Sequence, residues 1–215
     1  MRIAMLTWES LHSISLGGVA VHVTELAAAL ERKGHEVHVF TRMRYKNDSQ
    51  YDRIDGVHYH RVPYSGAADI VDDINQMCRA FVNSVFHVEN YMGAHFDIVH
   101  AHDWMASNSM VWIKEGRGRK SVLTMHSTEY GRCGNNFYNG RSARIMDHER
   151  HGTFCADKVI TVSQMLKNEL MWIYNLPDWK TSVVPNGISC HQFNGSIDPA
   201  SVRQRYGVGP MDPMV

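Results

Sequence analysis

The clearest indication of the fold is the stretch Phe96-Asp97-Ile98-Val99-His100-Ala101-His102-Asp103-Trp104. Ile98 and Val99 favour a β-strand, and no polar residue interrupts them before His100. In open α/β sheets, ligands bind in the crevice beyond the carboxyl ends of the strands. A strand that leads directly into His-Ala-His-Asp-Trp therefore predicts a binding site at one edge of a sheet.

The rest of the chain alternates short apolar segments with amphipathic ones. The apolar segments predict strands at residues 3–7, 37–41, 57–62, 97–101, 121–125, 158–162 and 181–185. Apolar residues at helical spacing predict helices at residues 19–33, 70–88, 105–114, 142–155 and 164–174. The polar segments 42–56 and 126–140 are predicted to be loops. Because strands alternate with helices along the whole length, we expect an α/β fold with a doubly wound, mainly parallel sheet.

Length and charge disfavour several classes of protein. The 215 residues suit one large or two small domains, and 22 basic residues balance 22 acidic ones. This balance does not favour a nucleic-acid partner. No apolar run approaches the length of a membrane span. We therefore expect a cytoplasmic protein without a transmembrane segment.

The cysteines are consistent with a reducing compartment. Cys78, Cys133, Cys155 and Cys190 lie far apart and form no C-x-x-C pair, so their spacing excludes a zinc ribbon and a thioredoxin-type motif. Free thiols are the simpler interpretation, and disulfides are the alternative.

A pair of glycines, Gly17-Gly18, opens the first predicted helix. Backbone N–H groups at a helix N-terminus bind phosphate, and glycine allows a ligand to approach the backbone closely. The dinucleotide fingerprint G-x-G-x-x-G is absent, and Thr41-Arg42 rather than an acidic residue ends the second strand. A nicotinamide-linked oxidoreductase is therefore disfavoured, whereas a phosphate-binding loop and a plain turn both remain open.

The histidines of the central stretch allow three interpretations. His100 and His102 are two residues apart on a strand, so their side chains point to the same side. With Asp103 and His126 they could begin a metal site. One imidazole could instead bind sugar hydroxyls or transfer a proton. Both could also be hydrogen-bonded histidines with a structural role only.

The segment after the fifth predicted strand combines hydroxyls, a carboxylate, an aromatic ring and a guanidinium. Its residues are His126, Ser127, Thr128, Glu129, Tyr130, Gly131 and Arg132. This mixture suits a polyhydroxylated ligand, and the alternative is a solvated surface loop.

Together these segments resemble a known family. The matching pieces are residues 17–23, 34–39, 97–104, 126–132, 156–163 and 184–188, in the order and at the spacing of the family. They are similar to the amino-terminal domain of retaining GT-B glycosyltransferases in glycosyltransferase family 4, which includes glycogen and starch synthase-like enzymes, sucrose synthases and bacterial mannosyltransferases. The resemblance implies a Rossmann-like sheet that forms one half of a two-domain architecture.

The resemblance also implies roles for individual residues. Gly17 and Gly18 match the loop that faces the donor diphosphate, and His102 matches the histidine that contacts the transferred sugar. The acceptor side is implied to comprise Glu9, His12, Asp103, Trp104, His126, Ser127, Thr128, Glu129, Tyr130 and Arg132. Many members carry Phe-Pro-Pro after the glutamate, whereas Ser10-Leu11-His12 follows Glu9 here, so the shape of the acceptor loop differs.

The implied reaction is transfer of a sugar from a nucleotide diphosphate sugar to a glycan or another hydroxyl acceptor, with retention and without a metal or other cofactor. Residues 1–190 are expected to form the acceptor-side domain, and residues 191–215 a linker or the start of a nucleotide-sugar-binding domain. In the family that second domain carries most of the donor site. We therefore expect this chain to be inactive without such a partner domain.

Two other functions remain open at this point. One is a metal-dependent hydrolase that uses His100, His102, Asp103 and His126. The other is a non-catalytic carbohydrate-binding module of the same fold. A tightly bound metal ion would favour the hydrolase, and activity of a longer protein would distinguish a transferase from the binding module.

Overall fold

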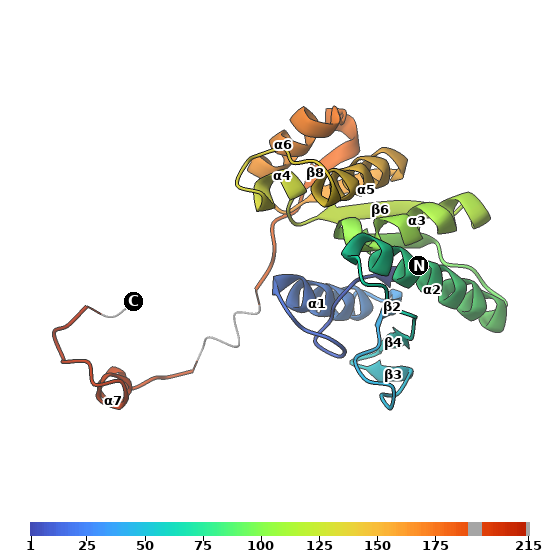
Figure 1. Ribbon diagram of the computed structural model, residues 1–215. Helices are drawn as coiled ribbons and strands as arrows, with labels where there is room; N and C mark the ends of the chain where they lie inside the picture. The colour runs from blue at the N-terminus through green and yellow to red at the C-terminus, as the bar shows by residue number, and fades with distance from the viewer. Residues whose placement is uncertain (189–194, 214–215) are drawn as a thin grey trace.

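The computed structural model describes residues 1–188 and 195–213. Its centre is an eight-stranded sheet, seen in Figure 1. Across the sheet the order is β3 (Tyr51–Ile54), β4 (Val57–Val62), β2 (Glu36–Arg42), β1 (Arg2–Leu6), β5 (Ile98–His102), β6 (Lys120–Met125), β7 (Lys158–Thr161) and β8 (Thr181–Val183). All neighbouring pairs are parallel except β3 and β4. The predicted α/β fold with a mainly parallel sheet is confirmed.

Helices join most of the parallel strands, and one more helix follows the last strand. They are α1 (Gly18–Arg32), α2 (Ile70–Met92), α3 (Asp103–Arg117), α4 (Glu129–Arg132), α5 (Arg141–Cys155), α6 (Gln164–Tyr174), the short 3₁₀ helix η1 (Asp178–Lys180) and α7 (Pro199–Arg205). Two of the predicted ends are confirmed. Helix α1 ends at Arg32, with Gly34 following in a left-handed conformation (φ +83°). Ser163 caps α6 by accepting a hydrogen bond from the Leu166 N–H.

The order of the strands places a topological switch point at the middle of the sheet. The chain leaves β1 towards β2 and β4, and then returns to place β5 on the other side of β1. The connection that follows β1 therefore leads to one side of the sheet, and the connection that follows β5 leads to the other side. In doubly wound sheets this switch point is where ligands bind, beyond the carboxyl ends of the strands. His102 is the last residue of β5, so it lies at this point.

The core has two parts, one on each face of the sheet. On β1, Ala4 and Leu6 pack into the larger part with residues of α2, α3, α5 and α6, whereas Ile3 and Met5 pack into the smaller part beneath α1. Met5 and Leu6 are both fully buried. Burying a side chain of this size contributes roughly 1.5–3 kcal/mol, so a strand covered on both faces holds the sheet together.

The segments predicted as loops contain two elements. The prediction of a loop over residues 42–56 is wrong in part, because β3 pairs there with β4 in an antiparallel hairpin. Asp55 and Gly56 join the two strands, and both have positive φ (50° and 79°), as a tight two-residue turn requires. The long polar segment after β6 also contains a short helix, α4.

The carboxyl-terminal segment is drawn apart from the sheet, and no residue of α7 is buried (Figure 1). The predicted domain boundary at residues 190–191 lies outside the described residues, so the division into domains stays a prediction. Cys190 also lies outside them. The other three cysteines, Cys78, Cys133 and Cys155, carry free thiols. Within the described ranges, no helix is long and apolar enough to cross a bilayer.

Candidate functional site

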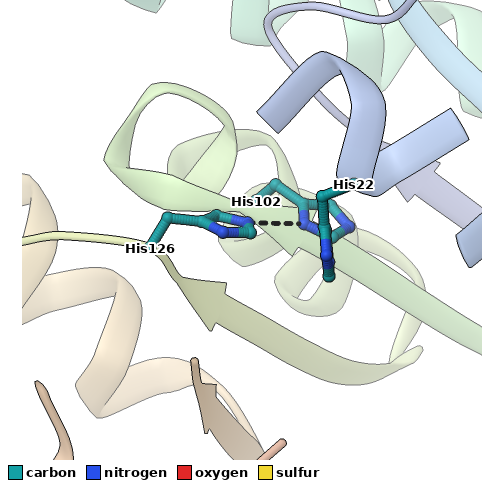
Figure 2. Close-up of side chains that lie close together, drawn as sticks. All are labelled: His22, His102 and His126. Carbon is teal, nitrogen blue, oxygen red and sulfur yellow. Dashed lines mark hydrogen bonds between the residues drawn. The ribbon is translucent and has the colours of Figure 1, made fainter. Parts of the chain in front are cut away.

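Three histidines meet at the crevice, as Figure 2 shows. His102 ends β5, His126 directly follows β6, and His22 lies on α1. Each offers one ring nitrogen, and these nitrogens all lie within 4.8 Å of one another. His102 Nδ1 and His126 Nε2 are hydrogen-bonded at 3.2 Å. The sequence placed His102 and His126 at this edge of the sheet, and the structure adds His22.

His102 and His100 differ in how well their nitrogens are satisfied. The two rings stack with centroids 4.4 Å apart, so both side chains lie on the same side, as predicted. His100 Nε2 is hydrogen-bonded to Thr124 Oγ1 at 2.7 Å. His102 is only 1% exposed, and its Nε2 atom is buried without a hydrogen-bond partner among the described residues. His102 therefore carries a buried ring nitrogen that no described protein group satisfies, whereas His100 does not.

The three clustered imidazoles are neutral at physiological pH. Burial is the main cause: it lowers the pKa of His22 and of His126 to about 4 each, and it places the pKa of His102 well below its usual range. Nearby imidazoles lower the pKa of His102 and His22 further. A neutral imidazole offers one donor and one acceptor, which suits hydrogen bonding to hydroxyl groups.

Asp103 connects the ends of β5 and β6. Its Oδ1 atom accepts a hydrogen bond from the His126 backbone N–H at 2.8 Å, and burial raises the pKa of its carboxyl to about 6. Asp103 begins α3 with a positive φ of 57°. For a residue other than glycine, this conformation destabilises the fold by roughly 1–3 kcal/mol. A strained residue immediately after His102 is typical of a functional site.

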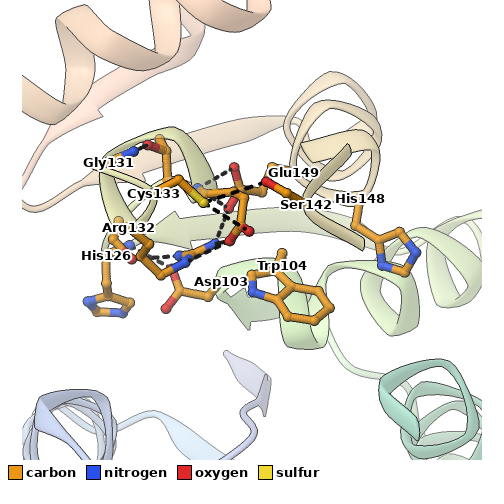
Figure 3. Close-up of polar contacts among 12 residues, drawn as sticks. Asp103, Trp104, His126, Gly131, Arg132, Cys133, Ser142, His148 and Glu149 are labelled. Carbon is orange, nitrogen blue, oxygen red and sulfur yellow. Dashed lines mark hydrogen bonds and ion pairs between the residues drawn. The ribbon is translucent and has the colours of Figure 1, made fainter. Parts of the chain in front are cut away.

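Trp104 is not part of the cluster of His22, His102 and His126. It is 6% exposed, belongs to the larger core and packs edge-on against His148, at 5.9 Å between ring centroids (Figure 3). Its predicted place on the acceptor side stays a prediction, but the structure gives this side chain a core position.

The segment after β6 is held by one buried carboxylate, that of Glu149 on α5 (Figure 3). Glu149 is 0% exposed, and it accepts hydrogen bonds from the Glu129 backbone N–H at 2.9 and 3.0 Å, Arg132 Nη2 at 2.6 Å and the Tyr174 hydroxyl at 2.5 Å. Arg132 in turn donates to Ser127 Oγ at 2.7 Å. The segment is therefore a braced structure and not a freely solvated loop.

The charges in this network shift each other. Burial raises the pKa of the Glu149 carboxyl even though Arg132 lies against it. Burial alone would lower the pKa of Arg132, but Glu149 raises it. The guanidinium therefore remains charged beside the crevice, where its charge also acts on Asp103.

The remaining residues of the segment have separate contacts. Thr128 caps α4 by accepting a hydrogen bond from the Gly131 N–H at 2.9 Å, and it also donates a hydrogen bond to Glu169. Tyr130 packs against Phe137 and Trp172, with ring centroids 4.7 and 5.4 Å away. Of the predicted acceptor-side segment, His126 is the residue that joins the histidine cluster.

The start of α1 already binds an internal anion. The Glu9 carboxylate accepts hydrogen bonds from the backbone N–H groups of Leu16 at 2.7 Å, Gly17 at 3.0 Å and Ala20 at 3.3 Å. A Cβ atom at Gly17 would lie 3.4 Å from Glu9, whereas one at Gly18 would meet nothing within 4 Å. Donor binding by both glycines stays a prediction, and the open space lies at Gly18.

His12 lies apart from the cluster. Its ring packs edge-on against Tyr59 of β4, with centroids 4.7 Å apart, and its carbonyl accepts a hydrogen bond from Arg61 Nε at 2.6 Å. Two strands, β2 and β1, separate β4 from β5. The structure therefore brings Glu9 close to the histidines but not His12.

Two residues of the site were not assigned a role from the sequence. His22 lies four positions after Gly18, within the first turns of a helix predicted to start at this edge, and that position was the available signal. Glu149 gave no signal, because a glutamate in an amphipathic helix is usually a surface residue.

This fold is that of a glycosyltransferase domain. The chain matches Glycosyltransferase Family 4 over residues 16–192, and it belongs to that family. It is 34% identical over 215 residues to an uncharacterized glycosyltransferase of Methanocaldococcus jannaschii, covering 99% of this chain and 53% of the relative. It is also 26% identical to glycogen synthase of Mycobacterium tuberculosis, covering 90% of this chain and 50% of that enzyme.

Solved structures share the fold. Sucrose-phosphate synthase from Thermosynechococcus elongatus has a TM-score of 0.78 at 18% identity, covering 99% of this chain and 54% of that one. Anabaena HepE in complex with UDP-glucose has a TM-score of 0.65 at 15% identity, covering 96% and 50%. The chain thus spans about half the length of the curated relatives it matches. The predicted family is confirmed, and the relatives support neither a hydrolase nor a non-catalytic module.

Proposed function

We propose that this chain forms the acceptor-side half of a retaining glycosyltransferase, which transfers a sugar from a nucleotide diphosphate sugar to a hydroxyl acceptor such as a glycan. Membership of Glycosyltransferase Family 4 supports the reaction class. The likeness in fold to HepE, whose structure contains UDP-glucose, supports a nucleotide sugar as donor. The half-length coverage of relatives supports a partner domain that supplies the rest of the donor site.

The unpaired Nε2 atom of His102 carries the proposal for this chain's own part. A buried polar atom without a partner destabilises a protein by about 1–3 kcal/mol, and a ligand hydroxyl would remove that penalty. His102 thus positions the transferred sugar through a hydrogen bond. Because this contact is a hydrogen bond, it needs no covalent bond between His102 and the sugar, and His102 does not act as the nucleophile.

The donor diphosphate is proposed to lie at the Gly18 end of α1. The helix dipole favours an anion there, but the Glu9 carboxylate already accepts hydrogen bonds from N–H groups at this end of the helix and offsets part of its positive potential. Most of the charge that stabilises the leaving phosphate would therefore come from the partner domain. We propose that the transfer uses no metal cofactor, that it takes place in the cytoplasm, and that this chain is inactive without its partner domain.

The acceptor is proposed to lie beside His126 and the segment braced by Glu149. The charged Arg132 faces this side and is held by Glu149 at 2.6 Å. A rigid segment orients an acceptor hydroxyl with less loss of entropy than a mobile one. Asp103, Ser127, Thr128, Glu129 and Tyr130 support this wall of the cleft through the contacts described above.

The test is His102→Ala in the full-length protein, assayed for sugar transfer. We expect kcat/KM to fall by about 100-fold or more, the range seen when one positioned polar group is removed from a transition-state site. His151→Ala is the matched control, because His151 is exposed on α5. Circular dichroism must show that both variants are folded. If His102→Ala stayed within a few-fold of wild type, the role given to His102 would be wrong.

A second donor sharpens the result. The resemblance places this histidine near the 6-hydroxyl of the sugar, so a 6-deoxy donor should be transferred poorly by wild type and equally poorly by His102→Ala. The quantity to compare is kcat/KM for the normal donor divided by kcat/KM for the 6-deoxy donor. If this ratio were the same in wild type and in His102→Ala, His102 would contact another group. Transfer activity itself separates a transferase from a non-catalytic module.

A further inference from the structure

The histidine cluster of His22, His102 and His126 has the composition of a metal site. The three imidazoles come from three separate elements, α1, β5 and the residue after β6, and their ring nitrogens lie within 4.8 Å of one another (Figure 2). Imidazole nitrogen is a preferred ligand of Zn²⁺ and related transition metals. His100 and Asp103, the other ligands considered from the sequence, are used elsewhere, by Thr124 and by the His126 backbone.

The spacing of the nitrogens fits a small ion. Tetrahedral Zn²⁺ holds nitrogens at about 2.0–2.1 Å, which places two ligand nitrogens about 3.4 Å apart. His102 Nδ1 and His126 Nε2 are already 3.2 Å apart. His22 is only half-buried on α1, so its ring can rotate towards the pair without disturbing the core.

The surroundings of the cluster favour a cation. Polar groups lie beside the other two histidines: the Asn186 side chain lies next to His22, and Asp103 accepts a hydrogen bond from the His126 backbone N–H. The Glu9 carboxylate acts electrostatically on His126, and it would offset part of the charge of a bound dication.

We infer that His22, His102 and His126 bind a single transition-metal ion, with Zn²⁺ as the best fit and a fourth position open towards the crevice. The binding does not depend on the proposed function. One consequence does rest on it: an ion on His102 Nδ1 would fix the ring proton on Nε2 and lie beside the place proposed for the transferred sugar, so the ion would act as an inhibitor of transfer.

The experiment titrates the 215-residue chain, freed of metal by a chelator, with Zn²⁺ in a calorimeter and with Co²⁺ in an absorption cell. We expect one ion per chain, with the visible absorption of four-coordinate Co²⁺. His22→Ala should weaken binding by about 100-fold or more, because losing one of three direct ligands costs at least as much as losing an outer-shell partner. His22 is half-buried on a helix surface, so this variant should remain folded.

His58→Ala is the matched control, because His58 belongs to a second group of histidines with His38 and His60 on the neighbouring strands. The inference is supported if His58→Ala binds like wild type while His22→Ala and His126→Ala do not. It is overturned if wild type binds no ion, if His22→Ala and His126→Ala bind as tightly as wild type, or if the His58→Ala variant alone loses the ion.

Discussion

Replacing Glu149 tests most directly what holds the segment after β6 in place. Its carboxylate is fully buried and is the common acceptor for Arg132, the Tyr174 hydroxyl and the Glu129 backbone N–H. Two variants separate its hydrogen bonds from its volume. Glu149→Leu keeps the approximate size and removes both acceptors, whereas Glu149→Gln keeps the shape and one acceptor.

The expected magnitudes follow from the donors left behind. In Glu149→Leu, the Glu129 N–H and the Tyr174 hydroxyl lose their buried acceptor, and each such loss destabilises by about 1–3 kcal/mol. The Arg132 side chain is 34% exposed, so water can take over part of its bond and its share is small. We therefore expect a loss of about 4 kcal/mol in the free energy of unfolding. In Glu149→Gln, the amide oxygen still accepts from Arg132 and Glu129, and the amide N–H can donate to the Tyr174 oxygen, so we expect a loss of only about 1 kcal/mol.

Urea unfolding followed by circular dichroism measures both values, provided that the slope with urea is unchanged. Glu115→Leu is the control, since Glu115 is an exposed glutamate on α3 and should change stability by less than about 0.5 kcal/mol. Two results would refute the reasoning: a Glu149→Leu variant within about 1 kcal/mol of wild type, or a Gln variant as unstable as the Leu variant.

Two further predictions concern stability. Burial lowers the pKa of His38 to about 4, helped by His58, while Glu36 opposes it; His60, its hydrogen-bonded neighbour, has its pKa lowered to about 3. The unfolded chain therefore binds protons below pH 6.5, where the folded chain does not, so stability falls as the pH drops from 7 towards 4. Between pH 7.5 and 5.0, His38→Gln should lose about 2 kcal/mol less of its free energy of unfolding than wild type does. An equal loss in both proteins would contradict this. Glu9→Gln should lower stability by about 1 kcal/mol, because one amide oxygen replaces two carboxylate oxygens at the start of α1; an unchanged urea midpoint would show that Glu9 does not cap it.

The central strands could be predicted because both of their faces are buried. Ile3 and Met5 face one part of the core and Ala4 and Leu6 the other, which produces a continuous apolar run. Strand β3 could not be found in this way, since it is an edge strand with polar residues. Its signal was the Asp55-Gly56 turn, which depends on local backbone conformation and not on apolar spacing.

The candidate site could be predicted in part for a similar reason. His102 and His126 follow adjacent parallel strands, whose carboxyl ends meet at one edge whatever the details of packing. His22 depends on how α1 is rotated over the sheet, and Glu149 depends on which face of α5 is buried. Both are set by tertiary packing, which a single sequence does not encode in its spacing. The same holds for His12 and Trp104. The structure does not test their predicted acceptor-side roles, and it does not bring either side chain to the cluster.

The hydrogen bond between His102 and His126 couples the positions of two protons. A neutral imidazole carries its single proton on one nitrogen or the other. If a ligand donates to His102 Nε2, the His102 proton must sit on Nδ1 and be given to His126 Nε2, which is 3.2 Å away. If the ligand accepts from Nε2, the direction reverses and His126 becomes the donor. The pair thus transmits the polarity of a hydroxyl bound on one side of the crevice to the other side, as a change of tautomer and without any movement of the backbone.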